Sequence, residues 1–176
     1  MTKHHLVRLV ASFAFLAAGL ALAPSSARAQ GGGFGAPGEI VIRGDFEGHL
    51  RNGWELRLHP SIDYFIAPNV SVGGLVGLQY NSGNPSRTTV DLGIRAGYDL
   101  AIANQLTFWP TVGIVYSHTS LSNNMGSGSS TNLEIFAPFL YHIVPHFFVG
   151  AGPIFDLSLD NNGNGYGLQT TIGGWF

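Results

Sequence analysis

The stretch from Thr88 to Leu100 constrains the fold more than any other part of the chain, because its side chains alternate in character. The even positions hold Thr88, Val90, Leu92, Ile94, Ala96, Tyr98 and Leu100, and the odd ones hold Thr89, Asp91, Gly93, Arg95, Gly97 and Asp99. A β-strand sends alternate side chains to opposite faces of a sheet. The stretch therefore predicts a strand with one apolar face and one face that is charged or nearly bare.

The first 29 residues predict a secretory signal peptide. A basic start that includes Lys3 and Arg8 precedes an apolar stretch, and Ala27-Arg28-Ala29 forms a small-x-small cleavage site before Gln30. A retained membrane anchor is the alternative, which the short apolar stretch and the cleavage site disfavour. Gln30 to Gly38 is rich in glycine and predicts a flexible leader, so residues 39–176 hold the fold.

Residues 39–176 divide into eight predicted strands with the same alternation. Their ranges are 39–50, 54–66, 70–80, 88–100, 106–118, 132–143, 147–159 and 166–176. Charged residues make up 10% of the chain, against about 25% in ordinary soluble domains. After the signal peptide, no apolar run reaches the roughly 20 residues of a membrane helix. The pattern predicts an all-β fold, an eight-stranded antiparallel up-and-down β-barrel.

Four prolines fall inside these predicted strands, at Pro60, Pro110, Pro138 and Pro153. Proline has no backbone N–H to give to a sheet ladder. We therefore expect bulges or ladder gaps at these positions.

Two features predict that lipid lies outside the barrel, although a soluble barrel around a cavity alternates too. Short connections follow the second, fourth and sixth strands, and longer polar ones follow the third, fifth and seventh, as in membrane barrels. The outward aromatic residues also fall into two belts, which membrane interfaces favour. The short-turn belt is Tyr64, Tyr98, Phe108, Tyr141, Phe147 and Phe176, and the loop-end belt is Trp54, Tyr80, Tyr116 and Tyr166.

Charges of both signs share the opposite face, which predicts a polar lumen. The inward set is Arg43, Asp45, Glu47, Arg57, Asp63, Asp91, Arg95, Asp99 and Glu134. The interior of an eight-stranded barrel is just wide enough for side chains to fill. Unpaired charges would be costly there, so we expect an ion-pair network.

The signal peptide, the eight strands and the terminal Trp175-Phe176 together resemble the small outer-membrane β-barrel family of Gram-negative bacteria, the OmpX and OmpA-barrel type. The resemblance implies an outer-membrane location and contact with outer-membrane lipid and lipopolysaccharide. It also implies that the barrel-assembly machinery reads the C-terminal aromatic residue, with Leu168, Ile172 and Phe176 on the outward face. Gly174 departs from the apolar residue that is usual there.

This resemblance favours a structural or surface-interacting protein, with its extracellular ligand left open. A narrow pore for ions or small solutes is the alternative function. The mature chain has five arginines and ten carboxylates, a negative balance that argues against nucleic acid as a partner.

A lipid-modifying hydrolase is a third hypothesis. His118-Thr119-Ser120 with Glu134 resembles the His-x-Ser and downstream Glu of outer-membrane lipid A deacylases, and Ser, His and Glu form a plausible hydrolytic set. The alternation, however, puts His118 and Ser120 on the outward face and Glu134 on the inward one. We expect no catalytic site.

Two further patterns suggest metal ligands. His49 and His59 face inward on neighbouring strands and could approach each other, but a metal site needs a matched set of ligands at short range. The segment Asp156 to Gly165 resembles a calcium loop yet lacks its alternating acids and closing glutamate. We expect no metal site and no cofactor.

Overall fold

The computed structural model describes residues 33–50, 54–82, 86–121, 126–160 and 163–176, with the side chains of 47–50, 54 and 55 outside the description. Within these residues no helix is long and apolar enough to cross a membrane. The strands are β1 Ile40–Leu50, β2 Trp54–Ala67, β3 Val70–Asn81, β4 Arg87–Tyr98, β5 Leu100–Ala103, β6 Leu106–Phe108, β7 Thr111–Leu121, β8 Ser127–Phe136, β9 Phe139–Val144, β10 Phe147–Ser158 and β11 Gly165–Trp175.

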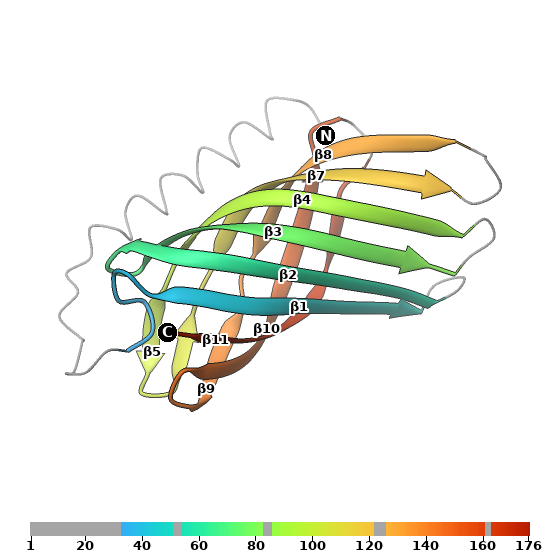
Figure 1. Ribbon diagram of the computed structural model, residues 1–176. Coiled ribbons are helices and arrows are strands. Elements are labelled where there is room, and N and C mark those ends of the chain that lie inside the picture. Colours follow the sequence, from blue (N-terminus) through green and yellow to red (C-terminus); the bar gives the residue numbers. More distant parts are fainter. Residues whose placement is uncertain (1–32, 51–53, 83–85, 122–125, 161–162) are drawn as a thin grey trace. The chain divides into compact units, whose positions relative to one another are not determined.

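The strands form one antiparallel sheet that returns on itself (Figure 1). Its ring runs through β1, β2, β3, β4, β7, β8, β10 and β11, and β11 pairs with β1. At the short-turn end the path instead passes through β5, β6 and β9. These pieces continue the predicted fourth, fifth and sixth strands, so the prediction of an eight-stranded up-and-down barrel is confirmed.

Prolines account for two of the interruptions in the strands. The break between β6 and β7 contains Pro110, and the break between β8 and β9 contains Pro138. Beside it, the carbonyl of Pro153 accepts a hydrogen bond from the amide of Ala137, at 3.0 Å. The ladder between β2 and β3 has no pair at Pro60. The predicted ladder gaps are therefore confirmed, and Pro110 and Pro138 explain why the predicted fifth and sixth strands are each split in two.

The two faces of the barrel wall have opposite chemistry. On β4, Val90, Leu92 and Ile94 are exposed, and Ile94 keeps 70% of its surface accessible. Asp91 and Arg95, between them in sequence, are buried inside the ring. A soluble carrier requires the reverse arrangement, so that alternative is wrong. The predicted transmembrane barrel with a polar lumen is confirmed.

An aromatic core fills the lumen at the short-turn end, and the sequence analysis did not predict it. Phe65, Trp109 and Phe148 are buried there together with Trp175 and Phe34. Phe34 belongs to the segment predicted as a flexible leader. Its described part, from residue 33, instead makes turns that put the Phe34 ring inside the barrel, because an aromatic side chain gains more from burial than the glycines around it lose in freedom.

Substitution by arginine tests which face meets lipid. Ile94→Arg places a charge on the apolar outer face and should lower the free energy of unfolding by about 2–4 kcal/mol in lipid vesicles. Ser117→Arg, on the inner face of β7 beside a polar cavity, should cost less. Urea unfolding of the refolded proteins measures both changes, and equal losses would mean that the faces are assigned wrongly.

Candidate functional site in the barrel lumen

Arg95 is the centre of an ionic cluster across the middle of the lumen. Its Nε donates to Asp63 Oδ1 at 2.9 Å, and its Nη2 donates to Asp63 Oδ2 and to Ser61 Oγ. Its Nη1 lies 3.5 Å from Asp45 Oδ2. Asp63 and Ser61 lie on β2, two strands from β4 in the ring, and Asp45 lies on β1, three strands away. Through charge-assisted hydrogen bonds, the cluster therefore joins β4 to β1 and β2, strands that are not its neighbours in the sheet.

Arg43 joins this cluster to the aromatic core below it. Its Nε lies 3.5 Å from Asp45 Oδ2 and 3.9 Å from Asp63 Oδ2. Its guanidinium carbon lies 4.6 Å from the ring centre of Trp109 and 5.5 Å from that of Phe136, within range of a cation–π interaction. Two arginines and two aspartates give this buried layer no net charge, which offsets the cost of removing each ion from water.

Glycines on the inner face make room for these large side chains. A Cβ on Gly73 would lie 2.2 Å from Asp63 Oδ1, and a Cβ on Gly97 would lie 2.7 Å from Trp109 Nε1. Real Cβ atoms do not approach so closely. The bare positions that alternate with charges in the sequence are therefore the space that the charges and the Trp109 ring occupy.

Above the ionic cluster, the lumen opens into a polar cavity of about 670 Å³ at the loop end. His59 Nε2 and Asp91 Oδ2 are 3.0 Å apart on its floor, and both side chains are buried. Arg57 Nη1 lies 3.5 Å from Asp156 Oδ2, and Arg57 Nη2 donates to Gln79 Oε1 at 3.3 Å. The cavity can therefore hold water or a small polar group among hydrogen-bonding partners of both signs.

Below the ionic cluster, Phe34 stands in a cage of aromatic rings. Its ring centre lies 5.1 Å from that of Trp109, 5.3 Å from Trp175, 5.4 Å from Phe65 and 5.6 Å from Phe148, all edge to face. Edge-to-face contacts at this distance are favourable for aromatic rings. Among the residues that the structure describes, the cage closes the short-turn end of the lumen.

Backbone hydrogen bonds hold the segment that carries Phe34. The amide of Gly38 donates to the Phe65 carbonyl at 2.8 Å, and the amide of Asn69 donates to the Gly35 carbonyl at 2.9 Å. Glu39 Oε2 accepts from the amides of Gly35 and Ala36. The segment is therefore fastened to β2 and to the turn before β3.

The structure brings some of the predicted lumen charges together and separates others. Buried charges of the predicted set are Arg43, Asp45, Asp63, Asp91, Arg95, Asp99 and Glu134. Arg57 is half-buried, and the side chain of Glu47 lies outside the described residues. Asp91 pairs with His59, which the predicted network did not contain, and Asp156 pairs with Arg57. Alternation predicted which residues face inward, but not which partners meet.

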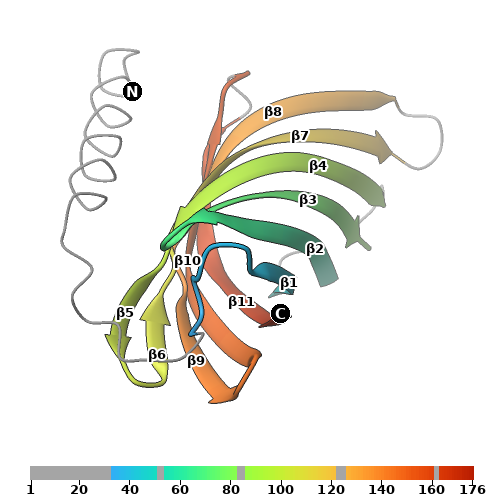
Figure 2. The same cartoon turned by 60° about the vertical axis from the view of Figure 1, so that its left-hand side comes forward.

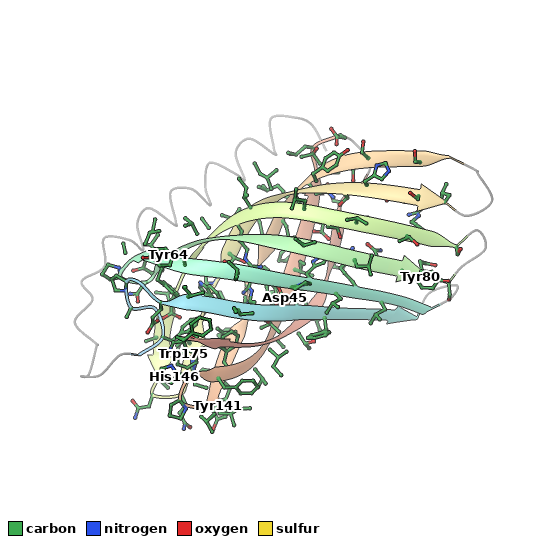
Figure 3. The ribbon with its side chains drawn as sticks, in the orientation of Figure 1. Asp45, Tyr64, Tyr80, Tyr141, His146 and Trp175 are labelled. Atoms are coloured by element: carbon green, nitrogen blue, oxygen red, sulfur yellow. The ribbon has the colours of Figure 1, made fainter. Side chains whose placement is uncertain are left out.

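The predicted aromatic belts lie at the two ends of the wall. Tyr64 and Tyr141 lie toward the short turns, and Tyr80 lies at the opposite end (Figure 3). The other exposed members of the belts are Tyr116, Phe147, Tyr166 and Phe176. Tyr98 is half-buried, as is Phe108, whose ring centre is 4.9 Å from that of Phe139. The Trp54 side chain falls in the part left undescribed.

The C-terminal strand shows both faces. Leu168, Ile172 and Phe176 point outward and are exposed. Trp175, between them in sequence, is buried in the aromatic core and lies 5.0 Å, centre to centre, from the His142 ring. Its place in the alternation could have predicted this inward orientation, which the sequence analysis did not use.

The hydrolytic set is not assembled. His118 and Ser120 are exposed on the outer face of β7, whereas Glu134 is buried inside on β8. In the ladder, His118 stands opposite Ser129, and Glu134 stands opposite Gly113. The lipid A deacylase hypothesis is wrong in its geometry, because these side chains leave the wall in opposite directions.

The structure does not assemble either of the two suggested metal sites among the described residues. The β1–β2 register pairs His49 with Glu55 and His59 with Asp45, so the two histidines stand apart along the strands. In the calcium-like segment, Asp160 Oδ2 accepts a hydrogen bond from the amide of Thr131. Over the described ranges, no three His, Cys, Asp or Glu side chains gather in a way that could hold a metal ion.

Neither a protein-family model nor a curated protein matches the sequence. Solved structures do match. The N-terminal β-barrel domain of Pseudomonas aeruginosa OprF matches with 17% identity and a TM-score of 0.58, over 80% of this chain and 98% of that one. Ail of Yersinia pestis, in complex with the heparin analogue sucrose octasulfate, matches with 15% identity and a TM-score of 0.57, over 80% of this chain and 99% of that one. Neisserial surface protein A matches with 12% identity and a TM-score of 0.54, over 78% of this chain and 92% of that one.

These neighbours are outer-membrane β-barrels, and the likeness to each spans nearly its whole length. The chain therefore has the fold of the small outer-membrane β-barrels. This confirms the fold that the resemblance in the sequence implied.

Removing the central cation tests the ionic cluster. Arg95→Met leaves the carboxylates of Asp45 and Asp63 buried without it, and breaking a buried pair from one side costs about 3–5 kcal/mol. Arg87→Met, at the exposed start of the same strand, should change the free energy of unfolding by less than about 0.5 kcal/mol. Urea unfolding in lipid vesicles measures both. Similar losses for the two variants would show that the cluster does not stabilise the barrel.

Removing the caged ring tests the aromatic core. Phe34→Ala should destabilise the barrel by about 3 kcal/mol, the usual cost of emptying a buried aromatic site. It should also move tryptophan emission to longer wavelength, because Trp109 and Trp175 lose a covering ring. Phe155→Ala, on the outer face, should leave the emission unchanged. An unshifted spectrum for Phe34→Ala would place Phe34 outside the lumen.

Proposed function

We propose that this chain is an integral protein of the bacterial outer membrane with a structural or surface-interacting role. The observation that carries the proposal is the division of the wall into an apolar outer face and a lumen with balanced charges. Such a wall is stable where its outside meets hydrocarbon. Every backbone donor must then be paired within the protein, a condition that an antiparallel ring of strands can meet.

Export and assembly follow from the same proposal. Residues 1–29 act as a secretory signal that is removed before Gln30. The outward Leu168, Ile172 and Phe176 then form the C-terminal signal for the barrel-assembly machinery. In the membrane, the exposed aliphatic and aromatic residues contact lipid and lipopolysaccharide, and the loops after β1, β3, β7 and β10 offer the contact surface for partners outside the cell.

The lumen supports this role better than a pore. Within the described part of the chain, the short-turn end is filled by the caged Phe34 and, above it, by the ionic cluster around Arg95. A solute would have to displace both layers. We therefore assign neither conduction nor hydrolysis to the chain.

The migration of the refolded protein in detergent gels tests the barrel, and planar lipid bilayers test conduction. The unheated protein should migrate faster than the boiled one, since a closed barrel resists unfolding by detergent. The mature protein should fractionate with the outer membrane, have the mass of a chain starting at Gln30, and stay silent in bilayers.

Two outcomes would contradict the proposal. Recovery of the folded protein from the soluble periplasm without detergent would exclude a membrane barrel. Stable single-channel steps would favour the narrow pore instead.

A further inference from the structure

The seam between the first and last strands is paired over only part of its height. β1 and β11 form pairs from Val41↔Trp175 to Phe46↔Thr170 and no further. Beyond that point β1 stays paired with β2 up to Leu50, and β11 stays paired with β10 down to its start. Continuing the same register would pair Gly48 with Leu168, but the described strands do not do so.

The two edges separate in space as well as in pairing. The loop-end half of β11 runs beside β10 and diverges from β1 (Figure 1 and Figure 2). On the outer face of β11, Tyr166 and Leu168 are 86% and 77% exposed, against 40% for Ile172 in the paired half. The last paired carbonyl, that of Phe46, accepts a hydrogen bond from the Thr170 hydroxyl at 3.0 Å. At this level the ladder therefore ends in the hydrogen bond that the Thr170 side chain makes to β1.

A polar interior lies directly behind this split. The cavity of about 670 Å³ is lined by Arg57 of β2, Asp156 of β10 and Gly165 of β11, strands that flank the opening. Lower on the inner face, Gln169 is 1% exposed, and neither atom of its amide has a hydrogen-bond partner in the structure as described. A buried amide without partners is costly, so Gln169 marks a place that a polar group would stabilise.

We propose that this split is a lateral portal that admits an amphipathic molecule from the outer leaflet. Tyr166 belongs to the loop-end aromatic belt, so the split lies at the level of the outer membrane interface. Unpaired strand edges are unfavourable in hydrocarbon, and a polar head entering between β1 and β11 would hydrogen-bond to them. A single acyl-type tail would remain outside against Tyr166 and Leu168.

The lining defines the head group that the portal takes. Around the cavity the two arginines Arg57 and Arg87 face three carboxylates, those of Asp91, Glu134 and Asp156, so an anionic head gains no net attraction. The Gln169 amide both donates and accepts hydrogen bonds. The ligand class is therefore a monoacyl amphiphile with an uncharged, hydroxyl-bearing head. This inference rests on the proposed membrane location and goes beyond the proposed role.

Paired spin labels in lipid nanodiscs test the split itself. Labels at Gly48→Cys and Leu168→Cys occupy the next outward pair beyond the end of the ladder, and labels at Phe46→Cys and Thr170→Cys occupy its last pair. The first distance should clearly exceed the second. Equal distances would mean that the seam is zipped in lipid and would overturn the portal. Gel migration would still report a barrel, so this failure is distinct from failure of the proposed function.

Titration with monododecanoylglycerol tests the ligand class. The side-chain amide NMR signal of Gln169 should shift and saturate, whereas glycerol and dodecane should produce no saturable shift. In Gln169→Leu, binding is followed by the NMR signals of Leu168. It should be about tenfold weaker, because one well-placed hydrogen bond is lost. Gln105→Leu, at the opposite end of the barrel, should leave it unchanged.

Two results of the titration would overturn the proposal. One is the absence of a saturable shift at Gln169 in protein whose labels report an open seam. The other is an additional distance, between labels on two molecules, whose population rises with protein concentration. The edges would then be covered by a strand of a second copy.

Discussion

The fold depends on the neutralisation of charge inside the wall, and above all on the contacts of Arg95 with Asp63 and Asp45. A narrow barrel in lipid must turn its polar side chains inward, where each isolated ion would be expensive. Arg95, on β4, resolves this by bonding to β1 and β2, which are not its neighbours in the sheet. The same bonds that satisfy the charges therefore also hold the ring together, and they leave the outer face free of these charges.

The lumen is layered along its axis, and each layer depends on the one beside it. Arg43 lies between the aspartates of the ionic cluster and the ring of Trp109, so it is both an ion-pair partner and a roof for the aromatic core. Phe34 then packs under Trp109 from a segment outside the ring of strands. Charge compensation in the middle and aromatic packing at the short-turn end together close that end, while the loop end holds the polar cavity.

Sequence alternation was sufficient to predict the strands, their faces and the polar lumen, because period two follows directly from strand geometry. It predicted that Asp91 and Arg95 point inward, but it could not predict that Asp91 meets His59 and that Arg95 meets Asp63. Those partners depend on the stagger between strands, which places residues far apart in sequence at one height. Alternation within single strands carries no information about that stagger.

The aromatic core was missed for a related reason. Phe65 and Trp109 occupy inward positions in the alternation. An apolar ring inside the lumen, however, contradicts the simple rule that charged side chains face the lumen and apolar ones face lipid. Phe34 lies in a glycine-rich segment with no periodicity at all, where composition favours a flexible leader. Only the closed end of the barrel offers it a set of rings to pack against, and that site does not exist until the strands have assembled.

The seam between β1 and β11 shows what closure of such a chain requires. Other neighbouring strands of the ring are joined by a turn or loop, but these two are joined only by hydrogen bonds. At the short-turn end the seam is strengthened by two bonds between Ile40 and Phe176 and by the burial of Trp175 beside Phe34. At the loop end nothing comparable crosses it in the described strands. Opening should therefore occur at the loop end, since the closing interactions are concentrated at the other.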